Sequence, residues 1–225
     1  AEDLILAIDD FNAAAELVIL GPSGEVLSRE RSGVAHRTRA GEIPVSHSPL
    51  VGELPIRYMD GDSQLEFILL VKLSAHHYAN RGIWGTPMLQ LRHQHRASVR
   101  SVRFRNGSLF GVLLIVGLYH LILFGGGRRD KAVFYFGLVC MAVGLRIFSM
   151  GVGQSLLLEK SLMTYRLLKA VEYGSLPLIA TTFGYFLNAL TPSRLFERFM
   201  RYWGLGFGGM LCLLALFTSP LTFSS

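Results

Sequence analysis

Four long apolar runs occupy the second half of this 225-residue chain, at 107–124, 132–153, 168–190 and 202–219. The first of them, GSLFGVLLIVGLYHLILF, carries no formally charged side chain over 18 positions. A helix needs about 20 predominantly apolar residues to cross the hydrocarbon core of a bilayer. Because that core holds no water, a spanning segment must satisfy its backbone polar groups internally, as a helix does. The runs therefore predict a bundle of four membrane-spanning helices surrounded by lipid.

Charge is divided unevenly between the two halves of the chain. Residues 1–106 hold 12 basic and 12 acidic residues, whereas residues 107–225 hold 10 basic and 4 acidic ones. The second half therefore supplies the whole formal net charge of +6. Its basic residues lie mostly in short segments between the apolar runs, which is typical of the loops of a membrane protein. A nucleic-acid site would instead gather them on one polar face, so no nucleic-acid partner is expected.

The distribution of basic residues predicts the orientation in the membrane. Segments 125–131 and 191–201 each contain three basic residues, which favours a cytoplasmic location for both and an outside location for the N-terminal half. Five arginines between residues 92 and 105 oppose this assignment, but long N-terminal domains cross largely regardless of charge. The opening AEDLILAIDD lacks the pattern of a signal peptide, which is therefore absent, removed or outside this sequence.

The first 92 residues have the pattern of short strands separated by turns. AELVIL (15–20) and EVLSRE (25–30) flank the turn signal GPSG, which predicts a hairpin. Further strands are predicted within QLEFILLVKL (64–73), after the turn signal MDGD (59–62), and at MLQL (88–91). Many short strands with regular turns favour a β-sandwich or a jelly roll.

These patterns divide the chain into three parts. Residues 1–92 are predicted to form an extracytoplasmic all-β sandwich, residues 93–106 a juxtamembrane connector, and residues 107–220 the helical bundle. In and just before the connector, arginines recur at helical spacings of three and four, which predicts a helix leading into the first span. The chain stops in LTFSS soon after the fourth apolar run, an end that suggests truncation after four spans.

Polar side chains inside the predicted spans are candidates for function. At about 1.5 Å per residue, Arg146 and Glu172 lie at similar depth, so a mutual ion pair is predicted. That pair either fixes helix register or belongs to a switch or a ligand cavity. His120 is expected to form a hydrogen bond within the bundle, with Tyr135 as a partner, or else to relay protons. Lys169 is expected to extend toward the interface.

Other motifs are few. The pairs Gly107/Gly111 and Gly204/Gly208 are GxxxG motifs, which permit close helix approach. Both cysteines lie in apolar runs and are interpreted as small buried hydrophobes. The segment HQH (93–95) has no acid or cysteine nearby in sequence, so no metal site is predicted. Phosphate loops and the HExxH, GxSxG and CxxC motifs are missing, so neither enzymatic activity nor a cofactor is expected of this chain.

Several stretches resemble one receptor family. GVLLIVGLYHLILF, RRDKAVFYFGLVCMAVGLR and the third-span opening LLKAVEYGSL are similar to the bacterial seven-transmembrane receptors with diverse intracellular signalling modules. The matching features are the G-LYH-LF ending, the RRD/K turn, the YFGL start and Leu-Arg end of the second span, and the Lys-x-x-Glu-Tyr entry to the third. The resemblance implies a multi-pass receptor of the bacterial inner membrane.

The resemblance also implies a jelly-roll-like or galactose-binding-like sensor outside the membrane, which binds carbohydrates or other small ligands. His77, Asn80, Arg81 and Trp84 are then the ligand-binding candidates, since they offer stacking and hydrogen-bonding groups that suit a sugar. The alternative is a loop packed on the rim of the sandwich. The family further implies seven spans and a cytoplasmic output module, such as a diguanylate cyclase or a histidine kinase, whereas four spans and no output module are predicted here.

The predicted function is therefore a transmembrane signalling receptor that relays binding of a small ligand through its helices, with a homodimer as one assembly considered. A transporter or a membrane-anchored accessory subunit is the alternative. Arg146, Glu172 and Pro177 offer some of the polar and helix-breaking groups that a transporter needs near the middle of the membrane. A purely structural anchor is the third reading.

Overall fold

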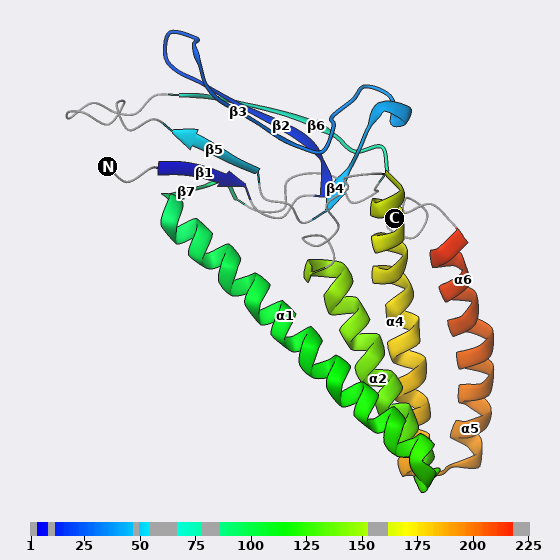
Figure 1. The fold of residues 1–225 in the computed structure, drawn as a ribbon. Coiled ribbons are helices and arrows are strands. Elements are labelled where there is room, and N and C mark those ends of the chain that lie inside the picture. Colours follow the sequence, from blue (N-terminus) through cyan, green and yellow to red (C-terminus); the bar gives the residue numbers. More distant parts are fainter. Residues whose placement is uncertain are drawn as a thin grey trace. The chain divides into compact units, whose positions relative to one another are not determined.

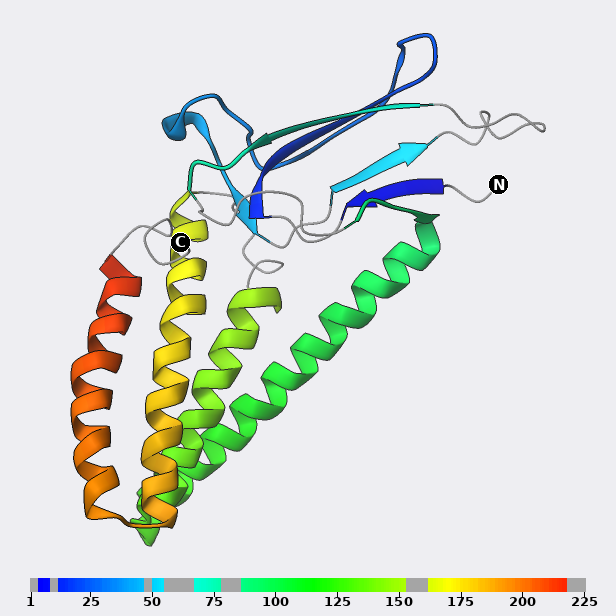
Figure 2. The same cartoon turned by 180° about the vertical axis from the view of Figure 1, so that it is seen from behind.

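The computed structural model describes residues 4–8, 12–46, 50–54, 67–77, 86–152 and 162–217. The chain forms two compact units, shown in Figure 1 and from behind in Figure 2. The first unit is built mainly from Ala1–Val102 and contains the strands. The second is built from Arg103–Leu158 and Arg166–Phe223 and contains most of the helical residues.

Two antiparallel sheets make up the described part of the strand unit. Its strands are β1 (Leu4–Ile8), β2 (Asn12–Leu20), β3 (Val26–Ser32), β4 (Val45–Ser46), β5 (Leu50–Leu54), β6 (Ile68–Ser74) and β7 (Met88–Leu91). One sheet has the order β5-β1-β7. In the other, β2 pairs with β3, β4 and β6. The prediction of a β-rich N-terminal region is confirmed, in the form of two small sheets.

A core of apolar side chains joins these two sheets. Along β2, Leu17 and Ile19 have no exposed surface, because alternate residues of a strand point to the same face. They pack with residues of the other sheet, including Leu6 of β1 and Leu50 of β5. Gly52 of β5 shows how close the approach is: a Cβ there would lie 2.5 Å from Ile19 Cδ1.

The predicted hairpin at GPSG is confirmed. Strands β2 and β3 pair antiparallel from Ala15↔Ser32 to Leu20↔Val26, and Gly24 has a φ of +85° that favours glycine in the turn. On this pair Glu16 accepts hydrogen bonds from Arg29 and Arg31, at 2.7 and 3.0 Å. The two guanidinium groups hold the pKa of the Glu16 carboxyl below its ordinary value. Strand β7 matches the predicted MLQL strand, β6 overlaps the prediction at 64–73, and MDGD lies outside the described residues.

In the described part of the chain, four helical stretches follow the strands. The first is α1 (Arg92–Leu123), which continues as a π-helical turn over Phe124–Arg128. The second is α2 (Lys131–Ile147) with a π-helical turn over Phe148–Val152, and the third is α4 (Leu162–Leu190). The fourth runs without interruption through α5 (Arg194–Arg201), the π-helical Tyr202–Gly208 and α6 (Gly209–Phe217).

By length and composition, two of the described helices could cross a membrane, Arg92–Gly127 and Lys131–Gly151. The turns that join α1 to α2 and α4 to α5 lie at the same end of the helical unit (Figures 1 and 2). In the first turn Gly127 adopts a φ of +110°, and Asp130 Oδ1 then accepts a hydrogen bond from Ala132 N at 2.9 Å. Segment 125–131 between the first two apolar runs is thus a turn, and its aspartate caps the next helix.

Neighbouring helices approach closely where glycines meet. A Cβ on Gly117 of α1 would lie 3.1 Å from the carbonyl oxygen of Gly137 of α2, and the reverse distance is also 3.1 Å. In the fourth stretch, Cβ atoms on Gly204 and Gly208 would lie 2.8 and 2.5 Å from side-chain atoms of Thr181 in α4. Small residues are what permits helices to pack at such distances in lipid.

The other predicted GxxxG pair makes no close contact. A Cβ at Gly107 or Gly111 would have no atom of the described chain within 4 Å. The motif alone did not separate the two pairs, because spacing says nothing about which face of a helix meets a neighbour. The contact glycines Gly117 and Gly137 lie outside either motif.

We expect Gly137→Ala to destabilise the helical unit by about 1–3 kcal/mol, since the new methyl group would press on the backbone of α1. The matched control is Gly111→Ala, where nothing lies in the way. Alanine is the better helix former, so the control should leave stability unchanged or raise it. Unfolding in detergent, followed by circular dichroism, measures both. Equal losses in the two variants would show that α1 and α2 do not pack through Gly137.

Candidate functional site

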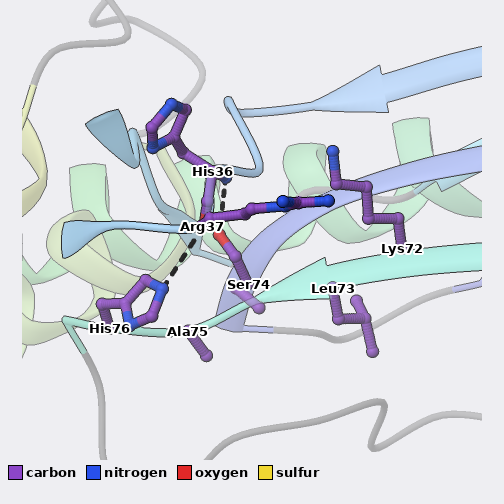
Figure 3. A pocket seen from close by; sticks show the side chains of 8 residues that line it. His36, Arg37, Lys72, Leu73, Ser74, Ala75 and His76 are labelled. Atoms are coloured by element: carbon purple, nitrogen blue, oxygen red, sulfur yellow. Dashed lines mark hydrogen bonds between the residues drawn. The ribbon is translucent and has the colours of Figure 1, made fainter. Parts of the chain in front are cut away.

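A groove of about 470 Å³ opens on the strand unit (Figure 3). Strand β6 and the residues just after it form one wall, and the segment before the 3₁₀ turn Arg39–Gly41 contributes the other. The residues that line the groove are Ala13, His36, Arg37, Lys72, Leu73, Ser74, Ala75 and His76. Cavities of a few hundred Å³ with a small number of polar groups are typical of small-molecule sites.

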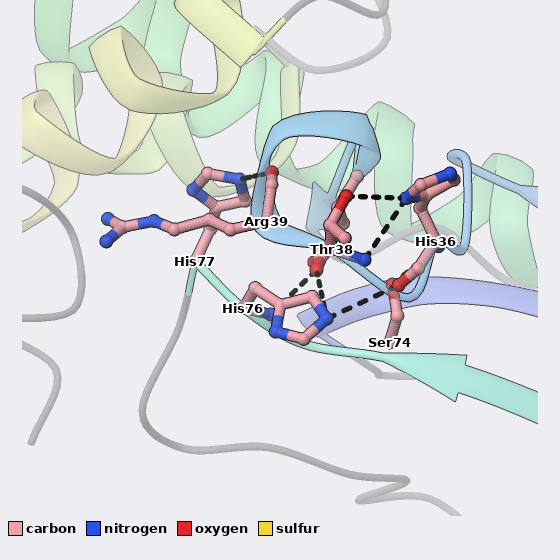
Figure 4. Close-up of polar contacts among 7 residues, drawn as sticks. His36, Thr38, Arg39, Ser74, His76 and His77 are labelled. Atoms are coloured by element: carbon pink, nitrogen blue, oxygen red, sulfur yellow. Dashed lines mark hydrogen bonds and ion pairs between the residues drawn. The ribbon is translucent and has the colours of Figure 1, made fainter.

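Hydrogen bonds hold the two walls together (Figure 4). The backbone N–H of His36 donates to Ser74 Oγ at 3.1 Å, and His76 Nε2 lies 3.3 Å from the carbonyl oxygen of His36. His36 Nδ1 accepts from the N–H of Thr38 at 3.1 Å, which places the ring proton of neutral His36 on Nε2. A Cβ on Gly41 would stand 2.4 Å from that Nδ1, so glycine leaves room for the ring.

Two buried titratable groups lie under this loop. The carboxylate of Glu42 has no exposed side-chain surface, and its Oε2 accepts from the N–H of His76 at 2.7 Å. His77 is also buried, and its Nε2 lies 3.0 Å from the carbonyl oxygen of Arg39. Among the described residues, Glu42 Oε1 and His77 Nδ1 have no hydrogen-bond partner. Glu42 and His77 each form one hydrogen bond from a buried position, and moving either side chain would break that bond. The two bonds therefore favour a fixed local arrangement.

The predicted ligand-binding residues are not among the described residues that line this groove. His77 contacts Arg39 and is not among the residues that line the groove. Asn80, Arg81 and Trp84 lie outside the described residues. Sequence reasoning missed His36, Arg37 and Lys72. The segment HRTR (36–39) was a visible signal, but its proximity to β6 follows from strand pairing that a single sequence does not reveal.

A second polar cluster lies inside the helical unit. Lys169 Nζ lies 2.9 Å from Glu172 Oε2, an ion pair between residues three apart on α4. Arg146 Nη1 of α2 donates to the backbone carbonyl oxygen of Glu172 at 2.9 Å. Ser175 Oγ donates to the same oxygen at 2.7 Å, and Ser149 Oγ donates to the carbonyl oxygen of Arg146 at 2.8 Å. Lys169, Ser149 and Ser175 are each at most 1% exposed.

The predicted ion pair between Arg146 and Glu172 is therefore wrong in its chemistry, although the two residues do meet. The carboxylate pairs with Lys169, and Arg146 reaches the backbone instead. The expectation that Lys169 extends to the interface is also wrong, since this side chain is buried. The physical reason is local: residues at i and i+3 of a helix share a face, so the lysine is already beside the carboxylate.

His120 is satisfied within its own helix. Its Nδ1 donates to the carbonyl oxygen of Val116 at 2.8 Å, and its ring meets Phe136 edge-on with centroids 4.7 Å apart. The predicted partner Tyr135 stacks on Tyr185 of α4, with centroids 5.3 Å apart. His120 thus forms a hydrogen bond, as predicted, but its partner is a backbone oxygen of its own helix and not Tyr135.

The described residues contain no group of three or more His, Cys, Asp or Glu side chains that could hold a metal ion. Of the HQH segment, His95 Nδ1 lies 2.8 Å from the amide nitrogen of Gln90. That histidine therefore links the last strand to the first turn of α1.

We expect strong coupling between Lys169 and Glu172 and weak coupling between Arg146 and Glu172. Lys169→Met leaves a buried carboxylate without its cation and should cost about 3–5 kcal/mol of stability, much of which Lys169→Met/Glu172→Gln should restore. Arg146→Gln/Glu172→Gln should be close to additive, because the arginine bonds to a backbone atom that the substitution retains. Double-mutant cycles in nanodiscs measure both. Strong coupling in the second cycle alone would contradict this arrangement.

Comparison with known proteins places the helical unit. A family model described as 7TM diverse intracellular signalling matches residues 103–225, more than half of the chain. Searches of curated proteins and of solved structures found no match. The matched region begins within α1 and includes all the helices that follow, so the protein is integral to a membrane with several spans. The chain therefore belongs to the 7TM diverse intracellular signalling family and contains the membrane region of a signalling receptor.

Proposed function

We propose that this receptor detects a small ligand with its N-terminal strand unit and transmits the change through α1 to the other helices. In this proposal the strands belong to a jelly-roll-like sensor outside the cytoplasm, and the ligand is a carbohydrate or a related small molecule. The membrane is the bacterial inner membrane, and the signal reaches an output module on the cytoplasmic side. This chain itself carries no catalytic step, and a homodimer is the assembly in which it would act.

The observation that carries the proposal is the direct join of strand to helix. Strand β7 ends at Leu91 and α1 begins at Arg92, with no residue between them. The strand is paired with β1 from Leu4↔Leu91 to Ala7↔Met88. A change in this sheet therefore acts on the start of a helix that continues without a break to Leu123.

Side-chain contacts fix this junction on the strand unit. Arg92 forms an ion pair with Glu53 of β5 at 2.5 Å, and His95 accepts from Gln90 of β7. Side chains from β5 and β7 thus hold the first turn of α1 in place. A stiff connection supports transmission of displacement, whereas a flexible linker would absorb it.

The polar cluster in the helical unit supports the second half of the proposal. Arg146 of α2 and Glu172 of α4 are joined by one hydrogen bond to a backbone oxygen, whereas the Lys169–Glu172 pair lies within one helix. A shift of α2 against α4 would break the first contact and leave the second intact. Ligand binding can drive such a shift only if the two packings differ in affinity for the ligand.

The orientation can be tested with truncated fusions to alkaline phosphatase, which is active only outside the cytoplasm. We expect inactive fusions after residues 126 and 192, in the turns at one end of the helical unit, and an active fusion after residue 152, where the second helical stretch ends. A cytoplasmic reporter should give the opposite pattern. Active phosphatase at both turns would reverse the proposed orientation.

Transmission can be tested on the full chain in nanodiscs, with spin labels replacing the exposed Leu118 in α1 and Phe183 in α4. Alanine replaces the native cysteines. We expect a sugar that raises the melting temperature also to shift the distance between the labels. Ala97→Gly/Ser98→Gly, in an exposed part of α1, should keep binding and lose the shift, since glycine weakens a helix by about 1 kcal/mol per residue.

Two outcomes would contradict the proposal. Binding with no change in distance would mean that the helices only anchor the strand unit. Transport of the sugar into sealed vesicles by the same chain would favour a transporter instead.

A further inference from the structure

The charged side chains that line the groove on the strand unit are positive. Among the described residues that line it are the permanent cations Arg37 and Lys72 and the imidazoles of His36 and His76, and none of these described residues carries a carboxylate. Figure 3 shows the Arg37 side chain extending along the groove toward Lys72. Both side chains are exposed, so they can turn toward a ligand. Two cations directed at one space repel each other, and this repulsion weakens when an anion lies between them.

Arg37 and Lys72 differ in their partners from several arginines of the same unit. Arg29 and Arg31 share the carboxylate of Glu16, and Arg92 pairs with Glu53. In contrast, neither the Arg37 nor the Lys72 side chain has a hydrogen bond or an ion pair within the described part of the chain, and Glu16, which stands opposite Lys72 across the β2–β6 pair, binds Arg29 and Arg31.

The buried carboxylate of Glu42 contacts one wall of the groove. Glu42 Oε2 accepts from the N–H of His76 at 2.7 Å and lies 4.0 Å from His76 Nε2, so Glu42 supports this wall from a buried position. The Arg37 segment is in turn held in place from both sides, by the His36–Ser74 bond and by the Val34↔Ile43 bridge. The cations are therefore presented on a fixed backbone, which lowers the entropy cost of binding.

From this arrangement we infer that the groove binds a small anionic ligand through a carboxylate. A guanidinium group matches a carboxylate with two parallel hydrogen bonds, and an ammonium adds a point charge. Ser74 and the imidazoles provide polar groups for hydroxyls, and Ala13, Leu73 and Ala75 provide apolar surface. The inference rests on the proposed function, and it narrows the carbohydrate ligand to an acidic sugar.

The test is calorimetry on the full chain in nanodiscs with matched probes, glucuronate against glucose and galacturonate against galactose. We expect the acids to bind and the neutral sugars not to bind. Arg37→Gln/Lys72→Gln should lower the affinity for the acids about tenfold or more, because each cation makes a charge-assisted contact. Raising the salt concentration should weaken binding, since the cations are exposed.

The control variant is Arg96→Gln/Arg100→Gln, which removes the same charge from exposed positions of α1 and should leave affinity unchanged. The melting temperature of each unliganded variant reports folding separately. Equal binding of acids and neutral sugars would overturn the anionic ligand and leave a sugar receptor standing. Binding of citrate without binding of any sugar would support the anionic groove and overturn the carbohydrate part of the proposed function. No binding of any acid, or equal binding to both double variants, overturns the inference.

Discussion

The buried charge of the helical unit constrains much of its packing. An ionised side chain inside a membrane is stable only if it finds a partner, and Lys169 finds Glu172 on its own helix. That choice leaves Arg146 without a carboxylate, and its guanidinium reaches the backbone of α4 instead. One arginine side chain thus links α2 to α4. The stacked Tyr135 and Tyr185 join the same two helices a few turns away.

Close packing of glycines performs the corresponding role for the other helix pairs. Gly117 and Gly137 bring α1 to α2, and Gly204 and Gly208 bring the fourth stretch to α4. The four stretches therefore contact each other in chain order, through two kinds of contact. A polar bond links α2 to α4, glycine packing links α1 to α2, and both kinds link α4 to the fourth stretch, where Tyr185 Oη donates to the carbonyl oxygen of Met200 at 3.2 Å. A bundle in lipid needs both, because apolar side chains alone gain little by leaving the lipid.

The sequence was informative where periodicity and composition decide the outcome. The apolar runs, the GPSG hairpin and the helical spacing of the arginines before the first span all have local causes, and each appears in the structure. It was misleading where two partners compete for one group, as at Glu172, because depth along a helix does not rank partners. It was silent on the groove, since Arg37 and Lys72 come together only through the pairing of strands far apart in the chain.

The join between β7 and α1 has a geometric consequence for the evolution of such receptors. An α-helix turns by about 100° and rises by about 1.5 Å with each residue. One residue added between Leu91 and Arg92 would therefore rotate every later side chain of α1 through more than a quarter turn relative to the strand that precedes it. Length changes at this point would act as changes of angle. The rotation of α1 relative to β7 is therefore determined by the length of the chain at this junction as well as by the residues of the helix.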